Sequence, residues 1–341
     1  MLLGETGVTK EEVNFEQVAR DVCKQVGFDH ESKGLNGLTC DVITNIEAQD
    51  AAIANAVHGA DTKTDDDLGA GDQGLMFGYA TDEYDQELLH PASHVFANRI
   101  CEEMAIARKN GSIPWLRPDC KSQVIIEYRQ ETDGRVTPLR CYNILISTQH
   151  DEEVTNETIK EVLIEKIIKK VVPEEMLKDC EFVINPSGKF CVGGPHADAG
   201  LTGRKIIVDT YGGWAPHGGG AFSGKDPTKV DRSGAYYARY VAKSLVAAGL
   251  CHRALVQVSY AIGMKDPLSI FVETYGTNKD GVSQDDIHNI VHNNFNFRPG
   301  NVIKELNLRR PIYQKTAAFG HFGRMDPDFT WEYPKKNLKL D

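Results

Sequence analysis

The chain has 341 residues, of which 41% are hydrophobic and 26% charged, and its formal net charge at pH 7 is −11. This usage is that of a globular protein, and the length predicts roughly two to three domains. The acidic balance excludes a general nucleic-acid binder, which would carry a surplus of Lys and Arg. No run of about 18 apolar residues occurs, so no membrane helix is expected, and the N-terminus lacks the basic flank of a signal peptide.

Helical and strand patterns alternate along the chain. Apolar residues recur at helical spacing in four segments, which are 11–26, 91–109, 156–170 and 234–249. Runs rich in Val, Ile and Tyr predict strands at 40–46, 122–128, 139–147, 205–211, 254–263 and 269–275. Because these elements interleave without a strict βαβ period, the sequence predicts an α+β fold with helices on one face of mixed or antiparallel sheets. Polar stretches at 58–72 and 276–286 are expected to be connections.

The eight cysteines are scattered singly, and no Cys-x-x-Cys pair occurs. This spacing indicates neither a zinc site nor a redox motif. Free thiols at this density are typical of a reducing compartment, so we expect a cytoplasmic protein. Most of these cysteines are interpreted as small buried hydrophobic side chains.

The most informative stretch is 185–232, which is rich in glycine and in basic residues. Between Gly188 and Gly234 lie 12 of the 31 glycines of the chain. Glycine at this density indicates backbone that turns tightly or approaches a ligand closely. The basic residues of the stretch are Arg204, Lys205, Lys225, Lys229 and Arg232. A glycine-rich basic cluster in an acidic protein favours a polyphosphate site, in which backbone N–H groups hold the oxygens and cations neutralise them.

Part of this stretch matches another phosphate-binding motif. Residues 219–225 read GGAFSGK, which fits the Walker A pattern G-x-x-x-x-G-K. However, Asp226 stands where Ser or Thr should bind Mg²⁺, and no strand leads into the glycines. We therefore favour a phosphate site of another design over a P-loop, and also over a flexible surface loop.

Four aspartates lie in loops beside glycine, proline or basic residues, namely Asp72, Asp119, Asp198 and Asp231. Each is a common turn-former, yet carboxylates near lysines can also hold Mg²⁺ against phosphates or bind a substrate ammonium group.

Other side chains are less informative. The two histidines His150 and His321 are interpreted as structural. Either of Phe190 and Phe222 could stack on a nucleobase, although core packing is the default for both.

Several blocks together resemble the S-adenosylmethionine synthase (methionine adenosyltransferase) family. The resemblance is carried by GAGDQGLMFGYATDE at 69–83, RKNGSIPWLRPDCKSQV at 108–124, ISTQHDE at 146–152, the stretch 185–243, QVSYAIG at 257–263, FRPG at 297–300 and KTAAFGHFGRMDPDFTWE at 315–332. It extends from about Leu2 to Glu332, and the run GGGAFSGKDPTKVDRS is its most specific part.

The resemblance implies an enzyme that joins ATP and L-methionine and releases phosphate and pyrophosphate, with Mg²⁺ and K⁺ as cofactors. It implies three similar α+β domains around a pseudo-threefold axis. These are a truncated N-terminal domain at 1–57, a central domain at 69–190 and a C-terminal domain at 191–332. A homodimer or homotetramer is implied as well, with no nucleic-acid or membrane partner.

The family's functional residues map onto this sequence by motif. The implied ATP-binding residues are Asp119, Lys121, Ser187, Gly188, Lys189, Phe190, Asp198, Arg204, Lys205, Ala221, Lys225 and Lys229. The implied methionine-binding residues are Glu5, Gln49, Asp72, Asp198, Lys229 and Asp231, and Asp231 is also the implied metal ligand. Lys225, Lys229, Arg204 and Lys205 are the predicted catalytic residues, because their charges would stabilise the departing tripolyphosphate.

The sequence also departs from the family pattern. The family's Glu-Gly-His-Pro-Asp-Lys segment, with its catalytic histidine and Mg²⁺-binding aspartate, has no counterpart among these residues, nor has the Cys-Glu-Thr segment that supplies a K⁺-binding glutamate. Lys189 replaces an arginine, and 50–57 read DAAIANAV where the family has Ser-Pro-Asp-Ile-x-Gln-Gly-Val. Three hypotheses follow. The chain is a synthase whose true start lies upstream, a catalytically impaired or regulatory paralogue that binds ATP or a partner synthase subunit, or an unrelated polyphosphate-binding module.

Overall fold

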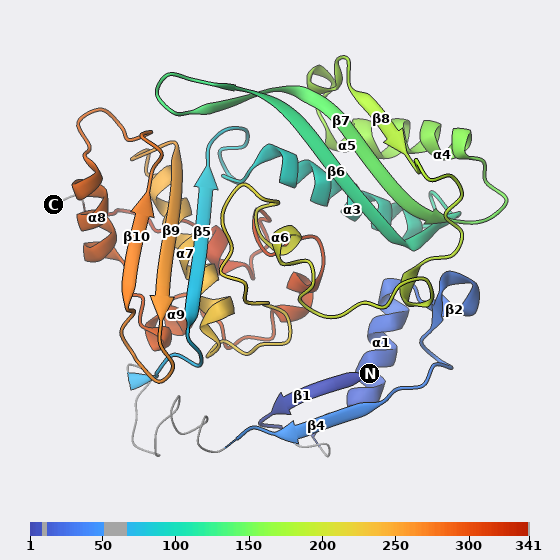
Figure 1. Cartoon of the computed structure of the whole chain (residues 1–341), viewed down its shortest axis with the longest axis horizontal. Helices are drawn as coiled ribbons and strands as arrows, with labels where there is room; N and C mark the ends of the chain where they lie inside the picture. Colours follow the sequence, from blue (N-terminus) through green and yellow to red (C-terminus); the bar gives the residue numbers. More distant parts are fainter. Residues whose placement is uncertain (9–11, 51–66, 340–341) are drawn as a thin grey trace. The chain divides into compact units, whose positions relative to one another are not determined.

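A computed structural model describes residues 1–8, 12–50 and 67–339 of the chain (Figure 1). Its contacts divide the chain into two compact units, each assembled from segments that are distant in sequence. The first unit is Met1–Ala51, Phe96–Ile125 and Arg140–Leu201, and the second is Ala52–Val95, Ile126–Leu139 and Thr202–Asp341. The predicted boundary at residue 57, the divergent stretch 51–57 and most of the predicted connection at 58–72 lie outside the described residues.

The N-terminal part of the first unit is a small layer of short elements. Strand β1 (Leu2–Thr6) pairs in parallel with β4 (Thr44–Ala48), with Glu5 opposite Glu47. Helix α1 (Phe15–Val26) lies between them in sequence. Its first turn is capped by Asn14, whose Oδ1 accepts a hydrogen bond from Gln17 N at 3.0 Å. The short elements β2 (Asp29–His30), η1 (Glu31–Lys33) and β3 (Leu35–Asn36) follow.

A second sheet carries the strands in the order β6-β7-β8, which are Leu116–Gln130, Val136–His150 and Glu181–Ile184. Strands β7 and β8 are parallel, with Asn143 opposite Glu181. The helical elements α3 (Ala92–Lys109), α4 (Asn156–Leu163), the π-helical turn η3 (Ile164–Ile168), α5 (Lys169–Val171), η4 (Glu174–Leu177) and η5 (Gly194–His196) complete this part of the chain.

The second unit is built on an antiparallel sheet in the order β10-β9-β5, which are Ser269–Glu273, Arg253–Tyr260 and Gly74–Thr81. Helix α7 (Val230–Ala247) packs against β5 so closely that a Cβ atom at Gly78 would lie 1.9 Å from the carbonyl carbon of Ala238. The other elements are α6 (Ile206–Asp209), α8 (Gln284–Asn294), α9 (Pro299–Glu305), η6 (Tyr313–Ala317) and η7 (Thr330–Glu332).

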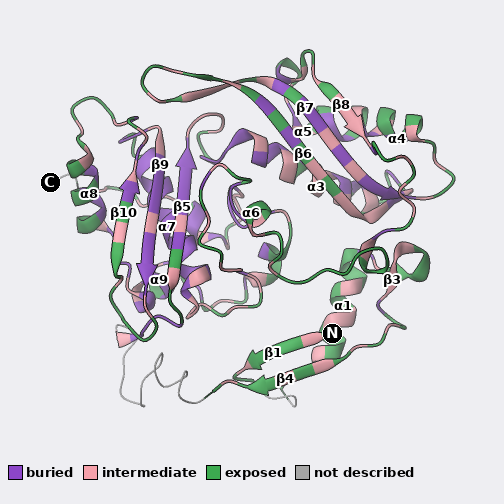
Figure 2. Ribbon diagram, in the orientation of Figure 1, coloured by how far each residue is buried: buried purple, intermediate pink, exposed green. Residues whose placement is uncertain are grey.

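Helix α7 is buried along most of its length (Figure 2), and it carries two members of a fully buried cluster of three charged side chains. Arg239 and Lys243 both bind Glu332 Oε2 at 2.8 Å, and Gly323 N donates to Glu332 Oε1 at 2.8 Å. Burial opposes ionisation of Glu332, but the two cations outweigh it and lower the pKa of this carboxyl to about 2. Because every charge is paired, the cluster ties the C-terminal segment to α7.

The α+β fold class is confirmed, and all four predicted helices are present. The predicted strand at 205–211 is wrong, because this stretch forms the short helix α6. Asp209 N donates to Lys205 O at 2.9 Å, and Thr210 Oγ1 donates to Ile206 O at 2.9 Å. No described strand pairs with this segment, so local hydrogen bonds outweigh the strand preference of its β-branched residues. Among the residues described, no helix has the length and apolar character needed to span a membrane.

Candidate active site

The glycine-rich loop between α6 and α7 is held in place by one buried arginine. Arg232, in the first turn of α7, is 3% exposed. Its guanidinium donates to the carbonyls of Phe222 and Lys225 at 3.2 and 3.1 Å and to Thr316 Oγ1 at 2.7 Å, and it lies over the ring of Tyr313 at 4.1 Å. Arg232 therefore shapes the loop from beneath, and its donors are used within the protein.

Two glycines let this loop lie flat against its neighbours. A Cβ atom at Gly218 would lie 1.6 Å from the carbonyl oxygen of Leu75 in β5, and one at Gly220 would lie 2.2 Å from the carboxyl carbon of Asp231. At Gly218 no side chain fits without backbone movement, whereas at Gly220 the side chain of Asp231 would have to move. The loop therefore runs between the start of β5 and the first turn of α7.

The next five residues, Gly220 to Gly224, present N–H groups that have no acceptor within the described part of the chain. Successive backbone N–H groups in a turn conformation can together form an anion-binding concavity, or nest. We call this stretch the amide cradle. The position of Lys225, five residues before α7 begins, and the lack of a strand leading into the loop exclude a P-loop, in which the lysine lies in the first helical turn.

Two lysines flank the amide cradle, and each is paired with a carboxylate. Lys225 Nζ forms an ion pair with Asp231 Oδ2. Lys229 Nζ lies 3.2 Å from Asp226 Oδ2. Burial opposes ionisation of Asp226, but hydrogen bonds from Thr228 and the charge of Lys229 outweigh it and lower the pKa of this carboxyl.

Two further segments reach the same loop. A Cβ atom at Gly203 would lie 2.4 Å from Ala221 Cβ, so Gly203 contacts the amide cradle. The exposed Arg204 and Lys205 come next in the sequence after Gly203. Gly71 N donates to Thr228 O at 3.1 Å, which places Asp72 close to Lys229.

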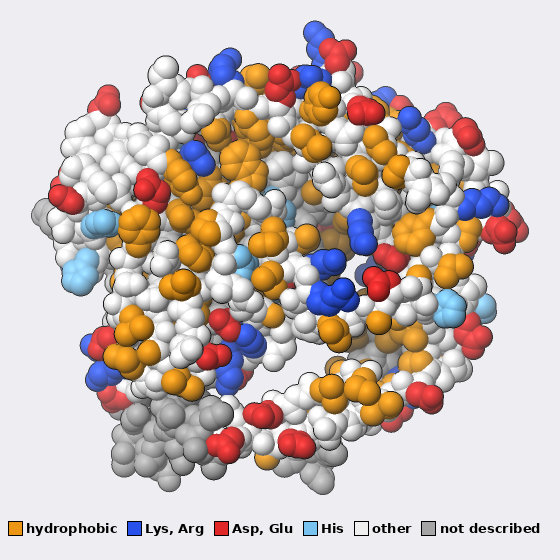
Figure 3. Space-filling model, viewed as in Figure 1, with side chains coloured by type: hydrophobic (Ala, Val, Ile, Leu, Met, Phe, Trp, Pro, Cys, Tyr) orange, Lys and Arg blue, Asp and Glu red, His pale blue; other side chains and the backbone are white. Residues whose placement is uncertain are grey.

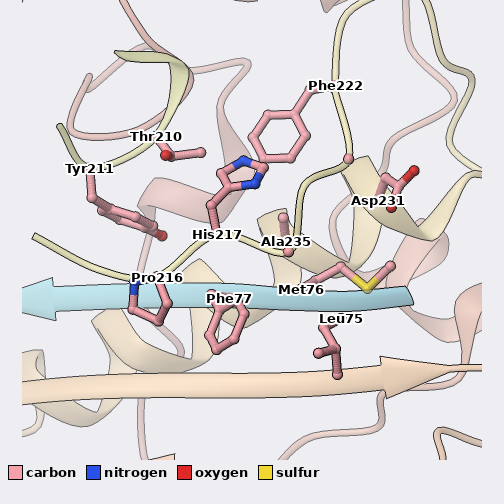
Figure 4. Close-up of a pocket in the computed structure, with 12 residues that line it drawn as sticks. Leu75, Met76, Phe77, Thr210, Tyr211, Pro216, His217, Phe222, Asp231 and Ala235 are labelled. Carbon is pink, nitrogen blue, oxygen red and sulfur yellow. The ribbon is translucent and has the colours of Figure 1, made fainter. Parts of the chain in front are cut away.

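His217 and Asp231 line a small pocket beside the amide cradle (Figure 4). Residues 75–77 of β5, Thr210, Tyr211 and Phe222 form other parts of its wall. Burial lowers the pKa of His217, although the nearby charge of Asp231 opposes this shift.

The first unit contains a separate group of the predicted residues. Asp119 Oδ2 accepts a hydrogen bond from Gly194 N at 2.9 Å. Phe190 N donates to His150 Nε2 at 3.0 Å, while His150 Nδ1 donates to Asp151 O at 2.7 Å. Both nitrogens of His150 are thus used within the protein, in agreement with its structural interpretation. His321 likewise lies in the core of the second unit, bound to the hydroxyl of Tyr236 at 2.6 Å.

The structure thus divides the predicted site residues into two groups. The second unit brings together Asp72, Arg204, Lys205, Ala221, Lys225, Lys229 and Asp231. The first unit carries Glu5, Gln49, Asp119, Lys121, Ser187, Gly188, Lys189, Phe190 and Asp198. Within it, Gln49 N donates to Thr6 O at 3.3 Å, so Glu5 and Gln49 lie near the same end of the β1–β4 pair.

Comparison with family models matches most of the chain. Residues 67–190 match the central domain of S-adenosylmethionine synthetase, and residues 192–333 match its C-terminal domain. The chain belongs to the S-adenosylmethionine synthetase family. The amide cradle and its lysines lie within the match to the C-terminal domain, whereas Asp119 and the stretch 187–190 lie within the match to the central domain.

Synthetases of this family use metal ions, and the pocket offers few ligands of its own for one. In the described part of the chain, no three His, Cys, Asp or Glu side chains are grouped as ligands for a metal ion. Mg²⁺ at phosphate sites commonly takes only one or two carboxylates and completes its shell with phosphate oxygens and water. Asp231, beside the unpaired amides, fits the role of a single protein carboxylate in such a site.

Sequence reasoning missed two features of this loop. It counted Arg232 among the phosphate-binding cations, whereas the structure buries this side chain beneath the loop. It also gave no role in the loop to His217, whose ring contacts the amide cradle. The sequence pattern that could have indicated this role is His-Gly-Gly-Gly. In it the imidazole, a hydrogen-bond acceptor, stands two residues before a glycine whose backbone N–H can donate to it.

Proposed function

We propose that the chain makes S-adenosylmethionine from ATP and L-methionine. The observation that carries this proposal is the amide cradle, flanked by Lys225 and Lys229 within the family match. A row of free amides with two adjacent cations suits a chain of phosphates, and a tripolyphosphate is the most highly charged group in the proposed reaction.

In the proposed reaction, a lone pair of the methionine sulfur forms a bond to C5′ of the ATP ribose. The C5′–O bond breaks, and its electron pair leaves with the tripolyphosphate, which water then cleaves to phosphate and pyrophosphate. The thioether needs no protein nucleophile, so the enzyme contributes positioning and charge stabilisation. Arg204, Lys205, Lys225 and Lys229 would stabilise the charge that develops on the leaving oxygen.

The other predicted residues would bind methionine and the rest of ATP. Asp72 and Asp231 would orient the methionine ammonium group, together with Glu5, Gln49, Asp198 and Lys229. Asp119, Lys121 and the stretch 187–190 would bind ATP, with Ala221 and Asp198. Asp231 would also hold Mg²⁺, whose charge neutralises phosphate oxygens when it is bound. K⁺ is proposed from the family resemblance alone, and no step above depends on it.

We also propose that the chain acts as a homodimer or homotetramer in the cytoplasm, without a nucleic-acid or membrane partner. Apolar side chains lie on the outer surface around β5, β9 and β10, where Leu75 and Phe271 are 45% and 46% exposed (Figure 3). Exposed apolar surface of this kind favours association. All eight cysteines are free, which suits a reducing compartment. The proposed domains remain 1–57, 69–190 and 191–332.

The test is direct synthesis by the purified full chain. ATP, L-methionine, Mg²⁺ and K⁺ are supplied, and S-adenosylmethionine is measured by mass spectrometry. We expect product in the wild type and a loss of at least about tenfold in Lys225→Ala, because one charge-assisted contact to the leaving group is removed. Lys279→Ala, an exposed lysine elsewhere in the second unit, is the matched control and should keep wild-type activity. Binding of ATP without any product would favour a catalytically impaired or regulatory subunit instead.

A further inference from the structure

His217 makes a short-range hydrogen bond to the loop that it precedes. Its Nδ1 accepts the N–H of Gly219 at 2.8 Å. Because Nδ1 accepts, the proton of the neutral ring is on Nε2. A side chain that accepts from the N–H two residues ahead sets the local turn, as Asn and Asp do in Asx-turns. Here the turn is the entry to the amide cradle.

The ring is also fixed from its other side. It stacks on Phe222, with ring centroids 5.8 Å apart and planes at 29° (Figure 4). Phe222 is 3% exposed and packs against His321 and Tyr236 in the core. The ring of His217 therefore joins the flexible glycine backbone to a buried aromatic cluster.

These two contacts bracket the entry to the amide cradle. The hydrogen bond is to residue 219, immediately before the first free amide, and the stacking is on residue 222, in its middle. Gly219 has φ +100°. Glycine adopts this conformation readily, but it adopts others as readily, so a contact from outside the residue is needed to favour it. Among the described residues, the bond to the ring of His217 is the one side-chain hydrogen bond of Gly219, and it favours this backbone conformation.

We propose that His217 is a positioning residue for the polyphosphate, acting through Nδ1 to hold the backbone at Gly219 in the conformation that leaves the amides of 220–224 facing a ligand. This inference rests on the proposed function and assigns the residue that prepares its anion site. The neutral ring that the role requires agrees with the burial-lowered pKa of this imidazole.

Three substitutions separate this role from its rivals. Asn places its Oδ1 near the position of Nδ1 and can accept from Gly219 N, so His217→Asn should keep the cradle. Gln places its amide near Nε2, so His217→Gln keeps a donor at the ring tip but loses the local acceptor. His217→Phe keeps the stacking on Phe222 and loses both nitrogens.

The experiment is calorimetric titration of the full chain with inorganic tripolyphosphate in Mg²⁺ buffer, with thermal unfolding of each variant as the folding control. We expect His217→Phe and His217→Gln to bind about tenfold more weakly than the wild type, and His217→Asn to stay within about threefold of it. Asn and Gln differ by only one methylene group, so the two variants are a closely matched pair. If the Phe variant fails to fold, the comparison of Asn with Gln still tests the role.

The outcomes also separate this inference from the proposed function. If the wild type itself does not bind tripolyphosphate, the proposed function loses its main support. If the wild type binds and His217→Phe binds equally well, His217 has no positioning role. If Gln rather than Asn restores affinity, the ring acts as a donor through Nε2, which overturns the inference as stated.

Discussion

The N-terminal segment and the α7 region show two different ways of presenting predicted site residues. In the described residues 1–8 and 12–50, only Gly27 and Gly37 are buried, and α1 has no buried residue. In α7, by contrast, 16 of its 18 residues are buried, and the amide cradle ends six residues before it. Glu5 and Gln49 thus come from a thin surface layer, whereas Lys225, Lys229 and Asp231 stand on a packed core. Predicted site residues that stand on buried secondary structure are preorganised by the fold, whereas those in the N-terminal layer have little packing of their own to hold them.

The largest expected effect comes from breaking the buried charge cluster under α7. Glu332→Gln leaves Arg239 and Lys243 buried without their partner charge, which should cost about 3–5 kcal/mol of the free energy of unfolding. Asp29→Asn removes the surface pair with Lys33 in the N-terminal segment and should cost at most about 1 kcal/mol. Urea unfolding of both variants measures the difference. Equal losses would contradict the contrast between the two regions.

A second comparison uses two glycines in strands. Gly78→Ala forces a Cβ atom into the backbone of Ala238, so we expect a loss of about 1–3 kcal/mol. Gly4→Ala, in β1, meets no atom within 4 Å and should be neutral or stabilise by up to about 1 kcal/mol, because alanine restricts the unfolded chain more. Thermal unfolding of the two variants checks the opposite signs. A stable Gly78→Ala protein would mean that α7 can move away from β5.

Acid should weaken the second unit through its buried histidines. Burial lowers the pKa of His94 to about 4, and burial with the charges of Arg232 and Arg324 lowers that of His321 to about 3. Their folded pKa values lie below the unfolded value of about 6.5, so the stabilisation is present above that pH and is lost as the pH falls below it. Each histidine should contribute a slope that approaches about 1.4 kcal/mol per pH unit near pH 5, between its unfolded and folded pKa values.

Urea unfolding at several pH values measures this slope. His94→Asn should lower the slope of the unfolding free energy against pH by the contribution of one histidine. This holds whatever the substitution does to stability at pH 7. An unchanged slope in that variant would mean that His94 takes up its proton in the folded state as readily as in the unfolded one.

Much of the fold was predictable because its patterns are local. The spacing of apolar residues located α3 within one residue, and the strands around 122–128, 139–147 and 254–263 are present, the first two much longer than predicted. Strand β5 (Gly74–Thr81) was missed, because Gly78, which lets α7 approach, interrupts the strand pattern. At 205–211 the β-branched residues predicted a strand, but no described strand pairs with the segment and local hydrogen bonds close it into a turn of helix.

The candidate site was predictable in residue types but not in geometry. Glycine density and basic charge predicted a polyphosphate site at 185–232, and the family resemblance selected individual lysines and aspartates. No sequence pattern distinguishes the buried Arg232 from the half-exposed Lys229 three residues earlier, because that difference depends on which side of α7 faces Thr316 and Tyr313. The grouping of Asp72 with Lys229 likewise depends on a contact between distant segments, Gly71 and Thr228.

The most direct test of the account is whether the amide cradle binds a phosphate chain. Inorganic tripolyphosphate is titrated calorimetrically into the full chain and into Lys225→Ala, Arg204→Ala and the control Lys279→Ala. The account predicts binding to the wild type and to the control with equal affinity, and a loss of about 10- to 150-fold in each of the other two variants, since each removes a charge-assisted contact. Absence of binding to the folded wild type, or unchanged affinity in both Lys225→Ala and Arg204→Ala, would contradict it.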